Sequence, residues 1–119
     1  MRMWMISPKI LCTNHLLGEH SEIHKHRHVF VKGWKITKRV EVNNIQIEPR
    51  SMKIRHDELV EEMLKRWPKE NGHKSVYEQP DLSFYSEYEQ NVVVDTKQSL
   101  EDLLNRCDKC KERYNLLFG

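Results

Sequence analysis

Side chains that can take up and release protons are concentrated at positions 15–24, where three histidines and two glutamates fall within ten residues. His15, Glu19, Glu22 and His26 follow one another at steps of four, three and four, so in a helix they lie along one face. Imidazole and carboxylate groups are the usual general acids and bases of enzymes. The spacing therefore predicts a polar, accessible helix face that could carry acid–base chemistry.

The helix that would hold this face is predicted over about residues 8–30. Ser7 followed by Pro8 is a favourable helix start, and Gly33 is a favourable stop. A neighbouring apolar stripe, which repeats every seven residues and can bury in a core, consists of Leu16, Ile23 and Phe30. One helix would then act as both scaffold and site.

Two further helices are expected later in the chain. Apolar residues recur at three- and four-residue steps over 52–67, and Pro68 stops the pattern. A third amphipathic pattern covers about 99–114 and opens with Ser99 and Asp102, which have the spacing of a capping box.

The segments between these helices are predicted as loops. Positions 34–48 alternate too irregularly to assign, and positions 69–98 are rich in turn-forming residues. The second loop is expected to be ordered and packed by its aromatic side chains, which are Tyr77, Phe84, Tyr85 and Tyr88. The fold class predicted is all-α, with three main helices and long ordered loops in a single compact domain over 1–119.

Composition narrows the classes of protein to consider. The chain has 119 residues, 38% hydrophobic and 32% charged, with no apolar run long enough to span a bilayer. Three cysteines form no dense disulfide framework, which suits a reducing compartment. We therefore expect a cytoplasmic protein with no membrane partner.

Basic residues are unevenly distributed, although the formal net charge is only +2. Positions 24–39 hold six lysines and arginines and no acidic residue. Such a run can bind phosphate groups, and it can equally be a solvated helix end followed by a loop. The charge alone leaves both interpretations open.

Several metal sites can be compared with the histidine spacing. His20 and His24 could share an ion, but a zincin helix needs glutamate directly after the first histidine, where Ser21 stands. A structural zinc site is harder to dismiss, because two pairs with two-residue spacing could complete a tetrahedron: Cys12 with His15, and Cys107 with Cys110. Against it, the two late cysteines lie on the apolar stripe of the third predicted helix, where cysteine is ordinarily a small buried hydrophobe.

Nucleophiles are few in this sequence. No cysteine has the surroundings of a catalytic thiolate, and neither a nucleophile elbow nor a glycine-rich phosphate loop is present. An α-amino group has a pKa of about 7.7 to 8.0, so it is the amine most available in neutral form. The amine of Met1 is the candidate nucleophile. Glu22 is the candidate partner, although a solvated helix carboxylate is the plainer interpretation of that residue.

Two segments resemble one known family. Residues 15–23, His-Leu-Leu-Gly-Glu-His-Ser-Glu-Ile, resemble the first-helix motif of the phage-type pyrimidine dimer DNA glycosylases, also called endonuclease V. Residues 55–66 are similar to the middle helix of that family, sharing its Arg, Glu-Leu, Glu and Leu-Lys-Arg. The resemblance implies a three-helix all-α domain, and it places Glu22 at the catalytic glutamate.

The same resemblance implies a reaction. The family's nucleophile is an α-amine followed by arginine, a place that Met1 and Arg2 occupy here. Because Arg2 is bulky, we expect Met1 to be retained. The implied activity is a DNA glycosylase and abasic-site lyase that acts on double-stranded DNA as a monomer and needs no cofactor, with His15 orienting Glu22 or the sugar. Candidate phosphate contacts are Arg2, Lys25, Arg27, Lys32, Lys35, Lys65 and Arg66.

The sequence also differs from the family pattern. Ser21 stands where the family has arginine, Lys25 replaces a downstream arginine, and residues 113–119 do not match the family's aromatic tail. Two alternatives therefore stay open. One is a non-catalytic DNA- or protein-binding module on the same scaffold. The other is a regulator stabilised by zinc at Cys12, His15, Cys107 and Cys110.

Overall fold

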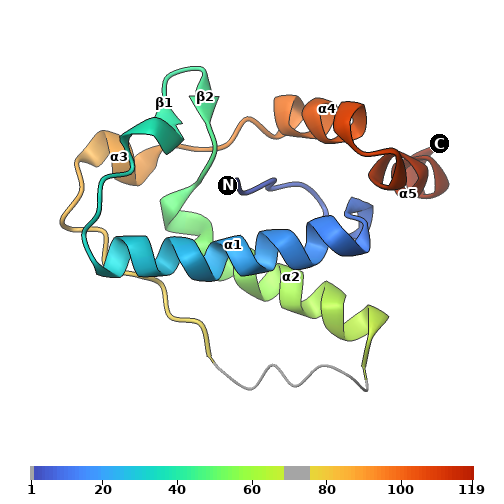
Figure 1. Ribbon diagram of the computed structural model, residues 1–119, viewed down its shortest axis with the longest axis horizontal. Helices are drawn as coiled ribbons and strands as arrows, with labels where there is room; N and C mark the ends of the chain where they lie inside the picture. The colour runs from blue at the N-terminus through green and yellow to red at the C-terminus, as the bar shows by residue number, and fades with distance from the viewer. Residues whose placement is uncertain (1, 69–75) are drawn as a thin grey trace.

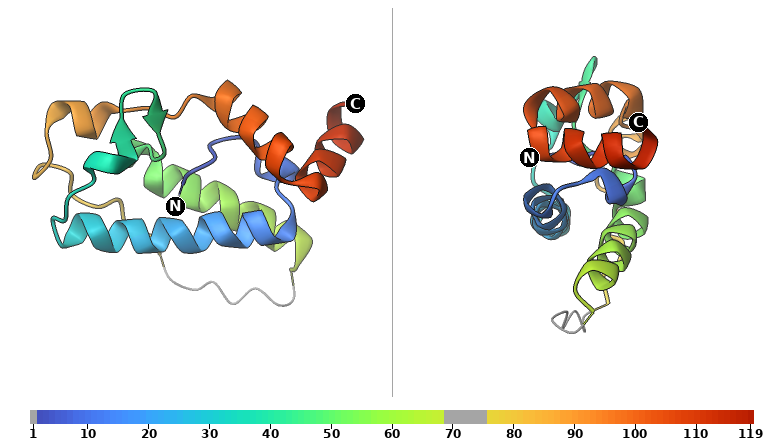
Figure 2. Two further views of the ribbon diagram at one scale, coloured as in Figure 1. Left: turned by 45° about the horizontal axis from the view of Figure 1, so that its top comes forward. Right: turned by 90° about the vertical axis from the view of Figure 1, so that its right-hand side faces the viewer.

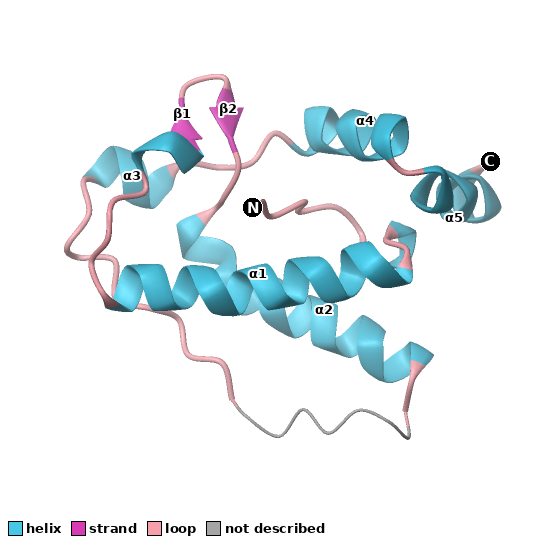
Figure 3. Cartoon of the chain, viewed as in Figure 1, coloured by secondary structure: helices cyan, strands magenta, loops and turns pink. Residues whose placement is uncertain are grey.

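A computed structural model describes residues 2–68 and 76–119 (Figure 1). The α-helices of these residues are α1 (Thr13–Val31), α2 (Met52–Arg66), α3 (Glu87–Asn91), α4 (Thr96–Arg106) and α5 (Asp108–Phe118). The described residues also contain a small two-stranded antiparallel sheet, a hairpin formed by β1 (Val40–Glu41) and β2 (Asn44–Ile45) (Figure 3). The prediction of a predominantly α-helical fold is confirmed. Among these helices, none has the length and apolar character that crossing a membrane requires.

The two long helices, α1 and α2, cross each other and form the base of the molecule (Figures 1 and 2). The apolar stripe predicted for the first helix faces the core, since Leu16 and Ile23 are fully buried and Phe30 is 3% exposed. Helix α2 buries Met52 and Leu59 against this stripe and ends at Arg66, just before the predicted stop at Pro68. The structure therefore confirms the prediction that both segments are helices with their apolar residues buried.

The start of the first helix differs from the prediction. Pro8–Ile10 forms a separate 3₁₀ turn, and α1 begins only at Thr13, with Cys12 as its N-cap. Ser7 makes no side-chain cap. Gly33 does follow the helix end, with a φ of 70° that favours glycine.

The segment predicted as loop at 34–48 contains the β1–β2 hairpin. Val40 pairs with Ile45 and Glu41 with Asn44, and Asn43 turns the chain with a φ of 67°. Asparagine tolerates this left-handed conformation better than most residues. The backbone of Gln46, just after the hairpin, accepts a hydrogen bond from the amide of Met3 at 2.7 Å, which ties the N-terminal segment down.

The third predicted helix is divided in two. Helix α4 starts earlier than expected, because Asp95 and not Ser99 caps it, accepting hydrogen bonds from the amides of Lys97 and Gln98. Ser99 is fully buried, and its hydroxyl donates to the carbonyl of Trp4 at 2.6 Å. The helix then stops at Cys107, whose extended backbone separates α4 from α5.

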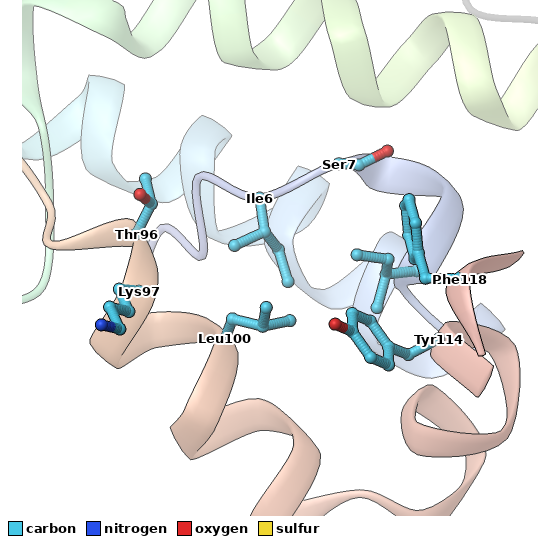
Figure 4. Close-up of a pocket in the computed structure, with 8 residues that line it drawn as sticks. Ile6, Ser7, Thr96, Lys97, Leu100, Tyr114 and Phe118 are labelled. Atoms are coloured by element: carbon cyan, nitrogen blue, oxygen red, sulfur yellow. The ribbon is translucent and has the colours of Figure 1, made fainter.

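Helices α4 and α5 close over the N-terminal segment, which lies between them and α1 (Figures 1 and 2). Side chains of Ile6, Leu100, Tyr114 and Phe118 point into an apolar pocket of about 380 Å³ at this junction (Figure 4). Residues from the N-terminal segment and from α4 and α5 therefore line the same pocket.

The long loop before α4 is only partly as predicted. Tyr77 and Tyr85 are buried and donate hydrogen bonds to the backbone of Ile23 and Trp34, so they do pack the loop. Phe84 and Tyr88 are mainly exposed. The short helix α3 interrupts the loop. Positions 69–75 of the predicted loop lie outside the described residues.

Candidate active site

A cleft of about 220 Å³ opens where α1, the N-terminal segment and the end of α4 meet. Helix α1 contributes its polar face, and the other two elements supply the opposite walls. The lining residues are Arg2, Trp4, Asn14, His15, Gly18, Glu19, Glu22 and Arg106. The cleft thus combines carboxylates, an imidazole and two guanidinium groups in a small volume.

Glu22 lies in this cleft, and its two carboxylate oxygens have different surroundings. Its side chain is 29% exposed, and Oε1 lies 4.0 Å from the ammonium of Lys25. Oε2 is buried without a hydrogen-bond partner among the described residues. A buried carboxylate oxygen without a partner is costly and uncommon, and such groups are found where a ligand or a reacting group completes the site.

Glu19, one turn earlier, is committed to the scaffold. It is 2% exposed, and both its oxygens accept hydrogen bonds from Arg55 on α2, at 2.6 and 2.8 Å. The third arm of that guanidinium donates to the carbonyl of Ile6 at 2.6 Å. The spacing had predicted that the whole polar face of α1 is accessible. Part of that face is buried instead, because Glu19 joins α1 to α2 through Arg55, which also holds the N-terminal segment.

His26 departs from the predicted accessible face in the same way. It is fully buried, and neither ring nitrogen has a hydrogen-bond partner in the part of the chain that the structure describes. Burial, reinforced by the charge of Arg39, lowers the pKa of His26 to about 4. His26 is therefore neutral at physiological pH and belongs to the core.

His15 lies in the cleft and contacts two cysteines. Its ring meets the Trp4 ring edge-on, with centroids 5.7 Å apart. Its Nδ1 atom lies 3.2 Å from Cys12 Sγ and 3.6 Å from Cys110 Sγ. Burial lowers the pKa of His15, against the opposing effect of Glu19. The structure therefore brings together the two ligand pairs that the sequence suggested for zinc.

Arg2 connects the N-terminal segment to α4. Its guanidinium stacks over the Trp4 ring at 4.3 Å and lies 3.3 Å from Asp102. Met1, the candidate nucleophile, lies outside the described residues. Trp4, Asp102 and Arg106 were missed by sequence reasoning, because no local motif links positions about 100 residues apart.

The remaining candidate phosphate contacts differ in whether their charged groups are exposed or already bound to other protein groups. Lys32 and Lys35 are exposed at the end of α1 and just beyond it. Arg27 donates to the backbone of Glu78 at 2.8 Å. On α2, Lys65 pairs with Glu61 at 3.6 Å, whereas Arg66 is held by Glu62 at 2.8 Å and by the carbonyl of Pro8 at 3.1 Å.

Outside the cleft, a cluster of three histidines joins α1 to α2. The Nε2 atom of His24 lies 3.3 Å from that of His20 and 3.1 Å from that of His56. Nδ1 of His56 lies 3.1 Å from a carboxylate oxygen of Asp57. The ring of Tyr77 stacks on His56 at 4.5 Å.

Comparison with known proteins gives one clear result. No curated protein matches the chain significantly, and no solved structure does so either. A family model described as pyrimidine dimer DNA glycosylase matches residues 1–75, which is more than half of the chain and includes Arg2, His15 and Glu22. The chain belongs to the pyrimidine dimer DNA glycosylase family.

Proposed function

We propose that this protein removes a damaged or modified base from double-stranded DNA and then cuts the strand at the abasic site. The α-amine of Met1 is the nucleophile and Glu22 is the proton-transfer group. The observation that carries the proposal is the buried Oε2 atom of Glu22, which has no hydrogen-bond partner among residues 2–68 and 76–119, in a cleft that Arg2, the neighbour of Met1, also lines. A pyrimidine dimer is the lesion that the family name suggests.

The reaction follows from the chemistry of an amine beside a carboxylate. The neutral amine attacks C1′ of the deoxyribose, the glycosidic bond breaks, and its electron pair leaves with the base, which takes up a proton. After the sugar ring opens, nitrogen and C1′ are joined as a protonated imine. Glu22 stabilises the positive charge that develops on the sugar during this step.

Strand cleavage uses the same carboxylate as a base. Glu22 removes a proton from C2′, and the electrons of that bond form a double bond as the C3′–oxygen bond breaks and the 3′ phosphate leaves. Water then hydrolyses the imine and frees the amine. His15 lies in the cleft about two helical turns from Glu22, where it can orient the sugar.

The basic residues near the cleft supply phosphate contacts in this proposal. Arg2 and Lys25 flank Glu22, and Arg27, Lys32 and Lys35 continue the positive charge along α1 and beyond its end. Lys32 is ten residues from Glu22, so it lies about 15 Å along the helix axis, the length of roughly four base-pair steps. Lys65 is a further surface contact. Arg66 already holds the 3₁₀ turn at Pro8, so its role here is structural.

Access to C1′ in a duplex requires a nucleotide to be turned out of the base stack. This step costs a few kcal/mol and is easier for a damaged or mispaired base. The cleft holds about 220 Å³, so it suits the sugar and its attached groups rather than a dimer of bases. The proposal therefore places the sugar, and not the lesion, against Glu22.

The decisive experiment is borohydride trapping on a duplex with one abasic site, followed by mass spectrometry of the adduct. We expect one covalent adduct, located on the α-amine of Met1. A duplex with a tetrahydrofuran site, which lacks the C1′ aldehyde, is the control and should give none. An adduct on a lysine would overturn the nucleophile assignment. A folded protein that binds the duplex and yields no adduct would overturn the enzyme proposal and indicate a binding module.

A further inference from the structure

We propose that Cys12, His15, Cys107 and Cys110 bind one structural zinc ion that fastens the C-terminal helices to α1. The four residues come from the two ends of the chain, and Cys107 and Cys110 lie beyond the stretch that matches the family. The proposal goes beyond the glycosylase activity and does not depend on it.

Two of the distances between the ligand atoms match the edges of a tetrahedral site, and a third is shorter. With Zn–S bonds of about 2.3 Å and Zn–N bonds of about 2.0–2.1 Å, the edges of a regular tetrahedron are about 3.8 Å between sulfurs and about 3.6 Å between sulfur and nitrogen. Cys12 Sγ and Cys107 Sγ are 3.8 Å apart. Nδ1 of His15 lies 3.2 Å from Cys12 Sγ and 3.6 Å from Cys110 Sγ, and all four atoms lie within 4.8 Å of one another.

The local backbone is arranged to support thiolates. The amide of Cys12 donates to Cys110 Sγ at 3.2 Å, and the amide of Cys110 donates to Cys107 Sγ at 3.4 Å. Cys12 and Cys107 are the N-caps of α1 and α5, so both helices direct the positive ends of their dipoles at the site. Backbone amides that donate to a sulfur favour its thiolate form, which is the form that binds a metal.

Two simpler explanations are a disulfide bond and the burial of cysteines as small hydrophobic residues. Neither accounts for the arrangement of the four side chains. A disulfide needs sulfurs about 2.05 Å apart, and all three cysteines are free. Burial as small hydrophobes would explain Cys12 and Cys110, which are 5% and 0% exposed. It does not explain why an imidazole nitrogen is directed at two sulfurs, or why the partly exposed Cys107 completes the group.

A closed set of four protein ligands indicates a structural ion, because a catalytic zinc keeps a position for water. The ion would hold one wall of the cleft, since Arg106 precedes Cys107 directly and lines that cleft. Coordination through Nδ1 also requires the neutral ring of His15 to carry its proton on Nε2. His15 would then act in the cleft as a hydrogen-bond donor and not as a base.

Cobalt substitution tests the site directly, without DNA. The full chain is purified under reducing conditions, freed of metal with a chelator and titrated with Co²⁺. We expect one equivalent to produce a thiolate-to-cobalt charge-transfer band in the near ultraviolet, together with the strong visible bands of tetrahedral cobalt. Zinc should then displace cobalt and bleach both bands. Circular dichroism of the metal-free protein shows whether the fold is kept.

Variants separate this site from the histidine cluster. Cys107→Ser, at the partly exposed helix break, should weaken cobalt binding at least tenfold and reduce the charge-transfer band. His24→Gln is the matched control and should leave that band unchanged, whatever metal the histidine cluster takes up. Limited proteolysis should release 96–118 faster from metal-free protein than from zinc-loaded protein.

Some outcomes would overturn the proposal. A folded, reduced wild-type protein that shows no charge-transfer band, or the same band in Cys107→Ser, excludes a Cys₃His site. Equal rates of proteolysis with and without zinc exclude the fastening role. Because these measurements use no DNA, their failure leaves the borohydride result intact, and a failed trapping experiment leaves the metal result intact.

Discussion

Glu19 and Arg55 face each other across the α1–α2 interface, with both carboxylate oxygens accepting from one guanidinium at 2.6 and 2.8 Å. Neither side chain is more than 2% exposed. Glu19 lies one turn before Glu22 on the same helix. This bidentate ion pair therefore fixes the rotation of α1 about its own axis, and with it the direction in which Glu22 points.

Removing one partner of this pair should be strongly destabilising. Glu19→Ala leaves the Arg55 charge buried and unpaired, and such changes cost about 3–5 kcal/mol of unfolding free energy. Urea denaturation measures the loss. The matched control is Glu61→Ala, which breaks the exposed pair with Lys65 and should cost at most about 1 kcal/mol. Equal losses in the two variants would contradict a structural role for Glu19.

Replacing Glu22 by glutamine should separate catalysis from binding. Glu22→Gln keeps the shape of the side chain but removes the base, so we expect single-turnover cleavage of abasic DNA to slow by at least about 100-fold. Affinity for the same duplex should change little. Thermal stability should not fall, because Oε2 has no partner to lose in the described part of the protein. Glu112→Gln, on the exposed side of α5, is the control, and cleavage by Glu22→Gln at the wild-type rate would refute the assigned role.

The positive charge beyond α1 should be visible in the salt dependence of binding. Replacing Lys32 and Lys35 by glutamine removes two phosphate contacts, which should lower the slope of log affinity against log salt by about 1.8. Cleavage of bound DNA at saturation should be unaffected. The matched control changes Lys109 and Lys111, which are exposed on α5. An unchanged slope in the first variant would show that this surface does not contact DNA.

Acid should destabilise the fold through His26. Burial lowers the pKa of His26 to about 4, whereas the unfolded chain has the ordinary value of about 6.5. The unfolded state therefore binds the proton more readily, and stability present above pH 6.5 is lost as the pH falls toward 4, by about 3 kcal/mol in total. Urea midpoints at pH 7 and pH 4.5 measure this loss.

A substitution on the same helix provides the comparison. His26→Leu should remove most of the acid-dependent loss, because leucine has no proton to bind. His28→Gln, at an exposed position, should keep it. If both variants lost stability to acid as the wild type does, His26 would not be the group responsible.

The sequence predicted the features that depend on local periodicity. The stripe from Leu16 to Phe30 and the apolar steps over 52–67 follow from helix geometry alone, and both are found as expected. The break at Cys107 has no such signal, since neither glycine nor proline marks it. At this break Cys107 contacts Cys12, and Cys110 contacts His15, each across 95 positions that local periodicity does not cover.

Polar residues on α1 show a second limit of prediction. Periodicity placed Glu19 and His26 on the same face as Glu22, but it could not show which of them would be covered. The partner of Glu19 is 36 positions away in sequence. Whether a polar side chain is buried depends on such distant partners, so the accessible part of the face became clear only from the packing of α2 and the N-terminal segment.

The contacts between the two ends of the chain also determine when the site can exist. Arg2 pairs with Asp102 and Trp4 with Ser99, across 100 and 95 positions. A ribosome delivers the residues of α1 well before those of α4 and α5. A nascent chain therefore carries Glu22 without the far wall of its cleft, and the cleft is complete only after α4 has been synthesised.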